Sequence, residues 1–166
     1  MKKLARLTAL LLTGALLLVL TACGAAPLTP EQQAKQEIFK AINDECQKAG
    51  MSPLKEVPAL TQLEQEFIEN FRKAGTKGIP SSEAEKLEGE LMDKQKKAGW
   101  QLTGGITYSY SEGSAKLSNV YEGDTEAFRK KLSIFSVENA STALSIGVVT
   151  IEGKIYWTAS TLKPKT

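Results

Sequence analysis

The sequence contains no histidine, and this absence removes several kinds of chemistry at once. Histidine is the commonest metal ligand and the usual acid or base near neutral pH, so Ser-His-Asp and Cys-His catalysis are excluded. Cysteine is almost as scarce, because only Cys23 and Cys46 occur. The chain also lacks a strong excess of either charge, with 21 basic and 19 acidic residues among 166. A composition that is 42% hydrophobic and 24% charged fits one globular domain.

Residues 1–22 are predicted to be a secretory signal peptide. Two lysines and one arginine start the chain, and an apolar run rich in leucine follows from Leu7 to Leu20, which is the order typical of secretory signals. The run is shorter than the ~20 apolar residues of a membrane-spanning helix. Removal of this segment takes away three basic residues and no acidic ones, so 18 basic residues remain against 19 acidic. A chain so close to neutral lacks the basic surface that binds nucleic acid.

The residues Leu20, Thr21, Ala22 and Cys23 resemble the lipobox of bacterial lipoproteins. In such proteins the cysteine is lipidated and becomes the first residue after cleavage. The resemblance implies that Cys23 is the lipidation site and that residues 23–30 form a lipidated tether. Such a cysteine carries several acyl chains, and two lipid signals already suffice for stable anchoring to a membrane. We therefore expect a secreted chain that is anchored to the outer side of a bacterial membrane.

With Cys23 lipidated, Cys46 is the only thiol left, so no internal disulfide can form. Cys46 falls on an apolar stripe with Ile38 and Ile42 in the first predicted helix. Free cysteine is common in protein cores, and burial raises the pKa of a thiol and makes it inert. We expect Cys46 to be a structural residue.

Three helices are expected before a strand-rich half. Thr29-Pro30-Glu31-Gln32 predicts a capping box at the start of the first helix. Ser82 and Glu85 predict a second capping box at the start of the third helix. The expected helices cover about 30–49, 59–74 and 83–98, with loops over 51–58 and 76–81.

From Trp100 the hydrophobic period changes to two, which predicts strands over about 106–110 and 116–121. Asp124 is expected to cap a short helix that reaches Leu132.

The clearest strand signal is a hairpin of residues 143–151 and 154–161 joined by Glu152-Gly153. Its first strand is apolar on both faces, so we expect it at the centre of a covered sheet. The order of elements predicts an α+β fold, an α-β-α sandwich in which helices cover a short antiparallel sheet.

Two groups of residues stand at a recognisable spacing: Asn43, Gly50, Pro53 and Leu54 in the first, and Gly147, Tyr156 and Trp157 in the second. This spacing resembles that of the CAP superfamily of SCP-like extracellular domains. Residues near the first predicted helix match the family's opening helix and loop, and residues near the C-terminus match its last hairpin. The resemblance implies a single CAP-like α+β domain over 31–162, with 163–166 as a C-terminal tail.

The sequence also departs from the family. The resemblance implies a cleft where two histidines and two acidic residues bind a divalent metal in some members, and this chain has no histidine. Cys46 stands where the family pattern has arginine. Glu112 is the one acid considered for a cleft position, although a turn role in Ser-Glu-Gly-Ser is the favoured interpretation. No metal site and no cofactor are therefore expected.

We expect a non-catalytic binding or structural module of the cell envelope. The partners considered are the membrane, reached through the lipid anchor, and an envelope lipid, peptidoglycan or another protein. One alternative is a cell-wall hydrolase that uses paired carboxylates, and another is a lipid-binding lipoprotein. The carboxylates considered for the hydrolase also fit a solvated face equally well, and they are Glu64, Glu66, Glu69 and Glu138.

Overall fold

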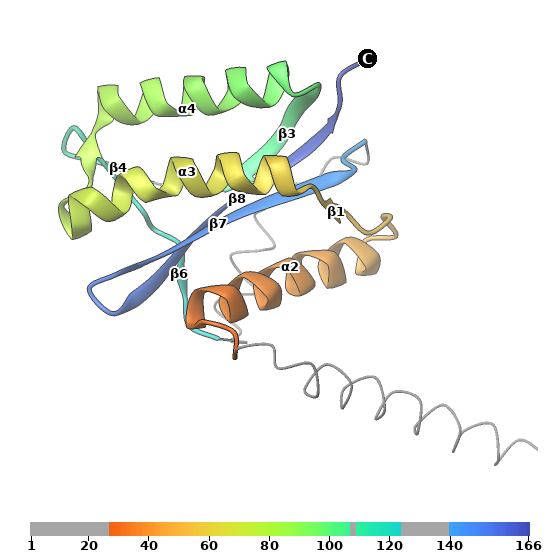
Figure 1. Ribbon diagram of the computed structural model, residues 1–166, viewed down its shortest axis with the longest axis horizontal. Helices are drawn as coiled ribbons and strands as arrows, with labels where there is room; N and C mark the ends of the chain where they lie inside the picture. Colours follow the sequence, from red (N-terminus) through yellow and green to blue (C-terminus); the bar gives the residue numbers. More distant parts are fainter. Residues whose placement is uncertain (1–26, 107–108, 124–139) are drawn as a thin grey trace, which may run out of the picture.

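The computed structural model describes residues 27–106, 109–123 and 140–166 (Figure 1). Three helices occur in these residues: α2 (Pro30–Lys48), α3 (Pro58–Ala74) and α4 (Ser81–Lys97), with a short 3-10 turn, η1 (Gly75–Lys77). This mixture of helices and strands confirms the predicted α+β class. The strands are β1 (Lys55–Glu56), β2 (Ile79–Pro80), β3 (Trp100–Ile106), β4 (Ser109–Ser111), β5 (Ser114–Lys116), β6 (Val120–Tyr121), β7 (Ala143–Ile151) and β8 (Lys154–Pro164).

The main sheet has the strand order β1-β7-β8-β3, and β6 also pairs with β8. Its neighbours run antiparallel except for the short parallel pair β1 and β7. Helix α2 packs on one face, where Ile38 and Ile42 join Ile146 and Trp157 in a buried cluster. Helices α3 and α4 lie over the opposite face, and Leu60 of α3 packs there on Leu162 (Figure 1). The described elements therefore form the expected helix–sheet–helix layers.

The first helix begins where the sequence predicts. The Thr29 hydroxyl accepts a hydrogen bond from the Gln32 backbone, and the Gln32 side chain accepts one from the Thr29 backbone. The helix ends at Lys48, and Gly50 takes the positive φ of 75° that glycine adopts most easily. These features depend only on neighbouring residues, which is why the sequence predicts them well.

Helix α3 packs directly on β7 at Gly147. A β-carbon at Gly147 would lie 2.7 Å from the backbone oxygen of Glu64 and 2.9 Å from the Ile68 side chain. Both distances are shorter than any normal packing contact. The absence of a side chain at Gly147 therefore sets the distance between this helix and the sheet.

Several expectations about element boundaries are wrong. Helix α4 begins at Ser81 after Pro80, with no side-chain cap, so the predicted capping box at Ser82 is not formed. The physical reason is tertiary, because Pro80 pairs with Ser114 in a small second sheet and the Ser81 amide donates to the carbonyl of Gly113. This second sheet, ordered β2-β5-β4, was not expected.

The strand predicted over 116–121 is divided into β5 and β6, which belong to different sheets. The predicted loops over 51–58 and 76–81 each contain a two-residue strand, β1 and β2. Such short strands carry no periodic signal and form only because β7 and β5 lie beside them. The helix expected over 124–132 lies outside the described residues.

The C-terminal hairpin is confirmed, with β8 extending three residues beyond the predicted end. Strand β7 is buried on both faces as expected, but it is not the central strand. Strand β8 has neighbours on both sides, whereas β1 covers only Ala143 and Leu144 of β7. Beyond that point the outer edge of β7 faces the space between α2 and α3.

Candidate binding groove

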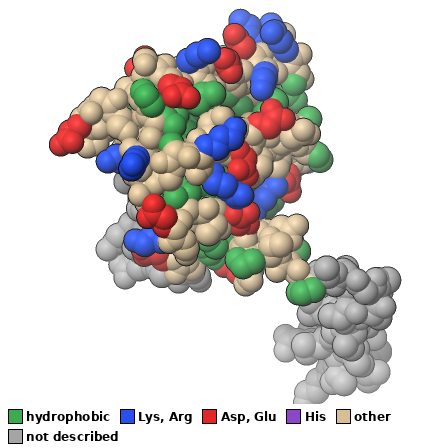
Figure 2. Space-filling view, turned by 60° about the vertical axis from the view of Figure 1, so that its left-hand side comes forward, with side chains coloured by type: hydrophobic (Ala, Val, Ile, Leu, Met, Phe, Trp, Pro, Cys, Tyr) green, Lys and Arg blue, Asp and Glu red, His purple; other side chains and the backbone are tan. Residues whose placement is uncertain are grey.

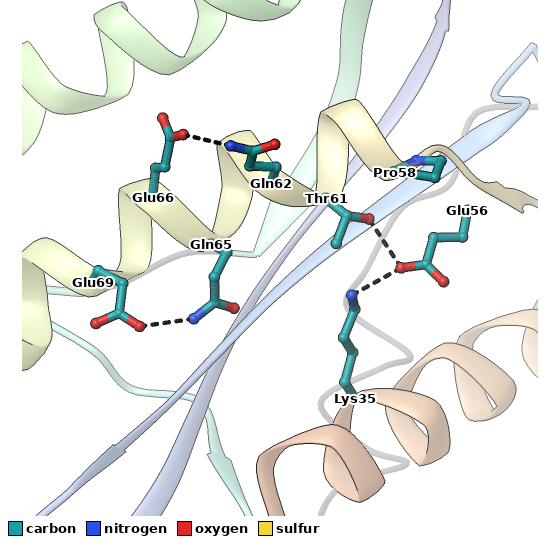
Figure 3. Close-up of a pocket in the computed structure, with 8 residues that line it drawn as sticks. All are labelled: Lys35, Glu56, Pro58, Thr61, Gln62, Gln65, Glu66 and Glu69. Atoms are coloured by element: carbon teal, nitrogen blue, oxygen red, sulfur yellow. Dashed lines mark hydrogen bonds and ion pairs between the residues drawn. The ribbon is translucent and has the colours of Figure 1, made fainter. Parts of the chain in front are cut away.

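A groove of about 430 Å³ opens between α2 and α3 beside the edge of β7 (Figure 3). Its volume is within the range of sites that bind small ligands or ligand fragments. Its walls carry amide, hydroxyl and charged side chains rather than aromatic rings. The lining residues are Lys35, Glu56, Pro58, Thr61, Gln62, Gln65, Glu66 and Glu69.

Side chains from both helices form hydrogen bonds with backbone groups on the outer edge of β7. The Gln65 carboxamide donates to the carbonyl of Val148 at 2.8 Å and accepts from the amide of Val148 at 3.0 Å. A carboxylate oxygen of Glu31 accepts from the Thr150 amide at 2.7 Å. Unpaired strand edges are prone to pair with other chains, so these side chains occupy positions that a further strand would otherwise take.

At one end of the groove Lys35 of α2 is joined to Glu56. The Lys35 ammonium lies 2.8 Å from a Glu56 carboxylate oxygen, which also accepts a hydrogen bond from the Thr61 hydroxyl at 3.1 Å (Figure 3). Burial by itself raises the pKa of Glu56, but the hydrogen bond and charge of Lys35 outweigh it and leave the pKa below its ordinary value. Glu56 is therefore an anion at neutral pH.

Ion pairs continue next to the groove along α3. Arg72 contacts Glu31 at 2.7 Å and Glu69 at 3.2 Å, and so links α3 to α2. Glu66 pairs with Lys94 of α4 at 3.3 Å. The face in Figure 2 likewise shows basic and acidic side chains interspersed. The groove therefore presents matched charges that can exchange partners with a ligand.

Glu64 lies on a different side of α3 from these carboxylates. It is 1% exposed, and its carboxylate accepts hydrogen bonds from Ser160 at 2.8 Å and Ser145 at 3.3 Å, between the helix and the sheet. Burial raises the pKa of Glu64, and the hydroxyls of Ser160, Thr158 and Ser145 oppose that rise. Glu66 and Glu69 both line the groove, but the structure does not bring Glu64 together with them, so the three described carboxylates of the hydrolase hypothesis do not all share one cleft. Glu138 lies outside the described residues.

The family-motif positions near the first helix have structural roles. The Asn43 side chain is buried, and it donates to the Leu54 carbonyl at 3.1 Å and accepts from the Leu54 amide at 2.7 Å. Leu54 is in turn buried in the α2 cluster, whereas Pro53 is exposed in the same loop. Cys46 is 3% exposed, and burial raises the pKa of its thiol. The expectation of a buried core cysteine is confirmed.

The later sequence candidates are spread over the hairpin and a turn. Trp157 is fully buried in the cluster under α2, and Tyr156 is half-buried on the opposite face of the sheet, against the cluster of Ile68 and Val149. Glu112 is an exposed turn residue with a positive φ of 51°, between β4 and β5, and it does not line the α2–α3 groove. The lipobox residues Leu20, Thr21, Ala22 and Cys23 lie outside the described residues.

Sequence reasoning did not identify the groove. A signal was present, because polar residues recur at helical spacing on one side of α3, at positions 62, 65, 66 and 69. The same pattern describes an ordinary solvated helix face. Only the packing of α2 on the sheet, which brings Lys35 opposite these residues, turns that face into the wall of a groove.

Within the described residues, no helix is long and apolar enough to cross a membrane. No cluster of three or more Cys, Asp or Glu suited to a metal ion occurs in the same residues. No family model, curated protein or solved structure matches this chain. The resemblance to CAP domains stays a prediction.

Proposed function

We propose that this protein is a membrane-anchored lipoprotein whose extracytoplasmic domain binds a ligand in the α2–α3 groove. The observation that carries the anchoring is Leu20-Thr21-Ala22-Cys23 directly after an apolar run. Six residues separate Cys23 from the first helical residue, Pro30, and an extended chain of that length spans roughly 20 Å. A domain on such a tether stays close to the membrane surface.

Binding fits this groove better than catalysis does. The carboxylates on its walls are engaged in ion pairs or amide hydrogen bonds, as Glu56 is with Lys35. The described carboxyl group whose pKa is raised is that of Glu64, and it is enclosed where no substrate reaches it. Polar groups on opposing helices are, by contrast, well suited to orient a bound molecule.

The anchoring is tested by mass spectrometry of the protein purified from bacterial membranes. The wild-type chain is expected to begin at Cys23 and to carry acyl chains there, and Cys23→Ser is expected to lose them. Cys46→Ala is the matched control, because it removes the other cysteine and leaves the lipobox intact. An N-terminal peptide that begins elsewhere, or that has no acyl chains, would refute the anchoring.

Ligand binding is tested separately by native mass spectrometry of the gently purified chain. A reproducible added mass is expected in the wild type and is expected to be lost in Thr61→Trp, which fills the groove. Glu83→Trp is the control, because it adds the same side chain at an exposed position of α4. An unchanged polypeptide mass in the wild type, or an added mass that survives in Thr61→Trp, would contradict groove binding.

A further inference from the structure

The outer edge of β7 is only partly used by the sheet. The pairs of β7 with β8 alternate, so the backbone groups of Ile146, Val148 and Thr150 point away from β8. Those of Val148 and Thr150 meet Gln65 and Glu31. Within the described part of the chain, no side chain bonds to the backbone groups of Ile146. Among residues 27–106, 109–123 and 140–166, no strand pairs with this edge beyond β1.

Gln65 imitates a neighbouring strand. Its carboxamide has the same donor and acceptor as a peptide group, and it makes both bonds to Val148. Unlike a strand, it stands on a flexible side chain that is half-buried on the groove wall. A peptide that enters the groove can therefore replace these two bonds one for one.

Replacement of Gln65 also frees an acceptor. The Gln65 amide donates to Glu69 at 3.0 Å, so its departure leaves that carboxylate oxygen without this donor (Figure 3). The other Glu69 oxygen is held by Arg72 at 3.2 Å. A lysine or arginine of the incoming peptide is the donor that best compensates a carboxylate.

We propose that the groove binds an extended peptide that adds to the edge of β7, takes the place of Gln65 at Val148 and sets a basic side chain against Glu69. This inference rests on the proposed function that the groove is a ligand site, and it names the class of ligand. Main-chain hydrogen bonds supply the attachment, and the carboxylate supplies the preference for a basic residue. The partner is a protein with an exposed basic segment that lacks fixed structure.

The experiment begins with the full chain purified in detergent and panned against a phage-displayed library of random eight-residue peptides. Enriched peptides are expected to contain lysine or arginine. The best one is then synthesised and titrated by fluorescence anisotropy. Versions with one backbone nitrogen methylated at a time test the pairing. Methylation at alternate positions is expected to abolish binding, because only every second amide faces β7.

Two variants of the groove and one control variant are titrated with the same peptide. Glu69→Gln is expected to weaken binding about tenfold, since it removes a charged acceptor. Gln65→Ala is expected to strengthen binding about three- to tenfold, since the peptide no longer competes with the carboxamide. Gln33→Ala is the matched control, because Gln33 is an exposed glutamine of α2 that bonds to Glu37 at 3.1 Å and does not line the groove.

The opposite results overturn the inference. Lack of any enriched peptide, equal sensitivity to methylation at every position, or unchanged affinity in Glu69→Gln would each refute strand addition. Self-association of Gln65→Ala without a gain in peptide affinity would show that Gln65 only protects the edge. An added mass in native mass spectrometry combined with a failed peptide screen would refute the peptide while leaving the proposed groove binding in place.

Discussion

Gly147→Ala offers a direct test of how closely α3 is packed on the sheet. The new β-carbon would lie 2.7 Å from the backbone oxygen of Glu64, whereas ordinary contacts begin at 3.4 Å. Helix α3 would therefore have to move by about 0.7 Å, the difference between those two distances. The closest atom belongs to the backbone and cannot rotate away, so the upper part of the usual ~1–3 kcal/mol for overpacking applies. The stiffer unfolded chain offsets about 0.5 kcal/mol, which leaves about 2 kcal/mol of destabilisation.

The assay is urea unfolding followed by circular dichroism, with thermal melting as a second readout. We expect the melting temperature to fall by about 8 °C, at roughly 4 °C per kcal/mol for a domain of this size. Gly89→Ala is the matched control, because Gly89 lies on the exposed face of α4 and has nothing within 4 Å of a β-carbon. That variant is expected to gain about 0.5–1 kcal/mol from higher helix propensity. A Gly147→Ala protein within 0.5 kcal/mol of the wild type would refute the packing argument.

Three further predictions concern buried polar groups. Because the folded state raises the pKa of Glu64, the contribution of Glu64 to stability is fully present below the ordinary value of 4.5. It falls as the pH rises toward the raised pKa, by up to about 1.4 kcal/mol per pH unit. Glu64→Gln should remove this fall in urea unfolding measured over a pH series, and equal pH slopes in the two proteins would contradict it. Asn43→Ala should lower the free energy of unfolding by about 1–3 kcal/mol, since both backbone groups of Leu54 lose a buried partner. Equal stability of this variant and the wild type in urea would show that water replaces the amide. Cys46 should react with a thiol reagent far more slowly in the native chain than in urea, and similar rates would mean that the thiol is accessible.

Local chemistry accounts for the features that the sequence predicts correctly. The capping box of Thr29 and Gln32, the positive φ of Gly50 and the turn at Glu152-Gly153 each involve residues within four positions of one another. The apolar runs on both sides of that turn predict the hairpin for the same reason. The burial of Cys46 also follows from helical spacing, because its neighbours one and two turns away are apolar.

Features that join distant segments could not be predicted in this way. Ser82 is a residue type that often caps helices, but the pairing of Pro80 with Ser114 starts the helix at Ser81, two residues before the predicted start. Gln65 belongs to a row of polar residues that looks like a solvated helix face. Its role depends on Val148, which lies 83 positions away in the sequence. Sequence periodicity reports which side of an element is apolar, but it does not report what lies opposite.

The sequence by itself determined the absence of histidine chemistry, the α+β class and the helices that precede the hairpin, and anchoring to a membrane stays a prediction from the sequence. Each of these depends on composition or on spacing within one element, and both are complete in the chain before it folds. Only the tertiary structure decided that Glu64 is enclosed while Glu66 and Glu69 line a groove, although all three lie within two turns of α3. The reason is that Gly147 lets the helix lie close against the sheet, and this contact decides which carboxylate is buried and which can meet a ligand.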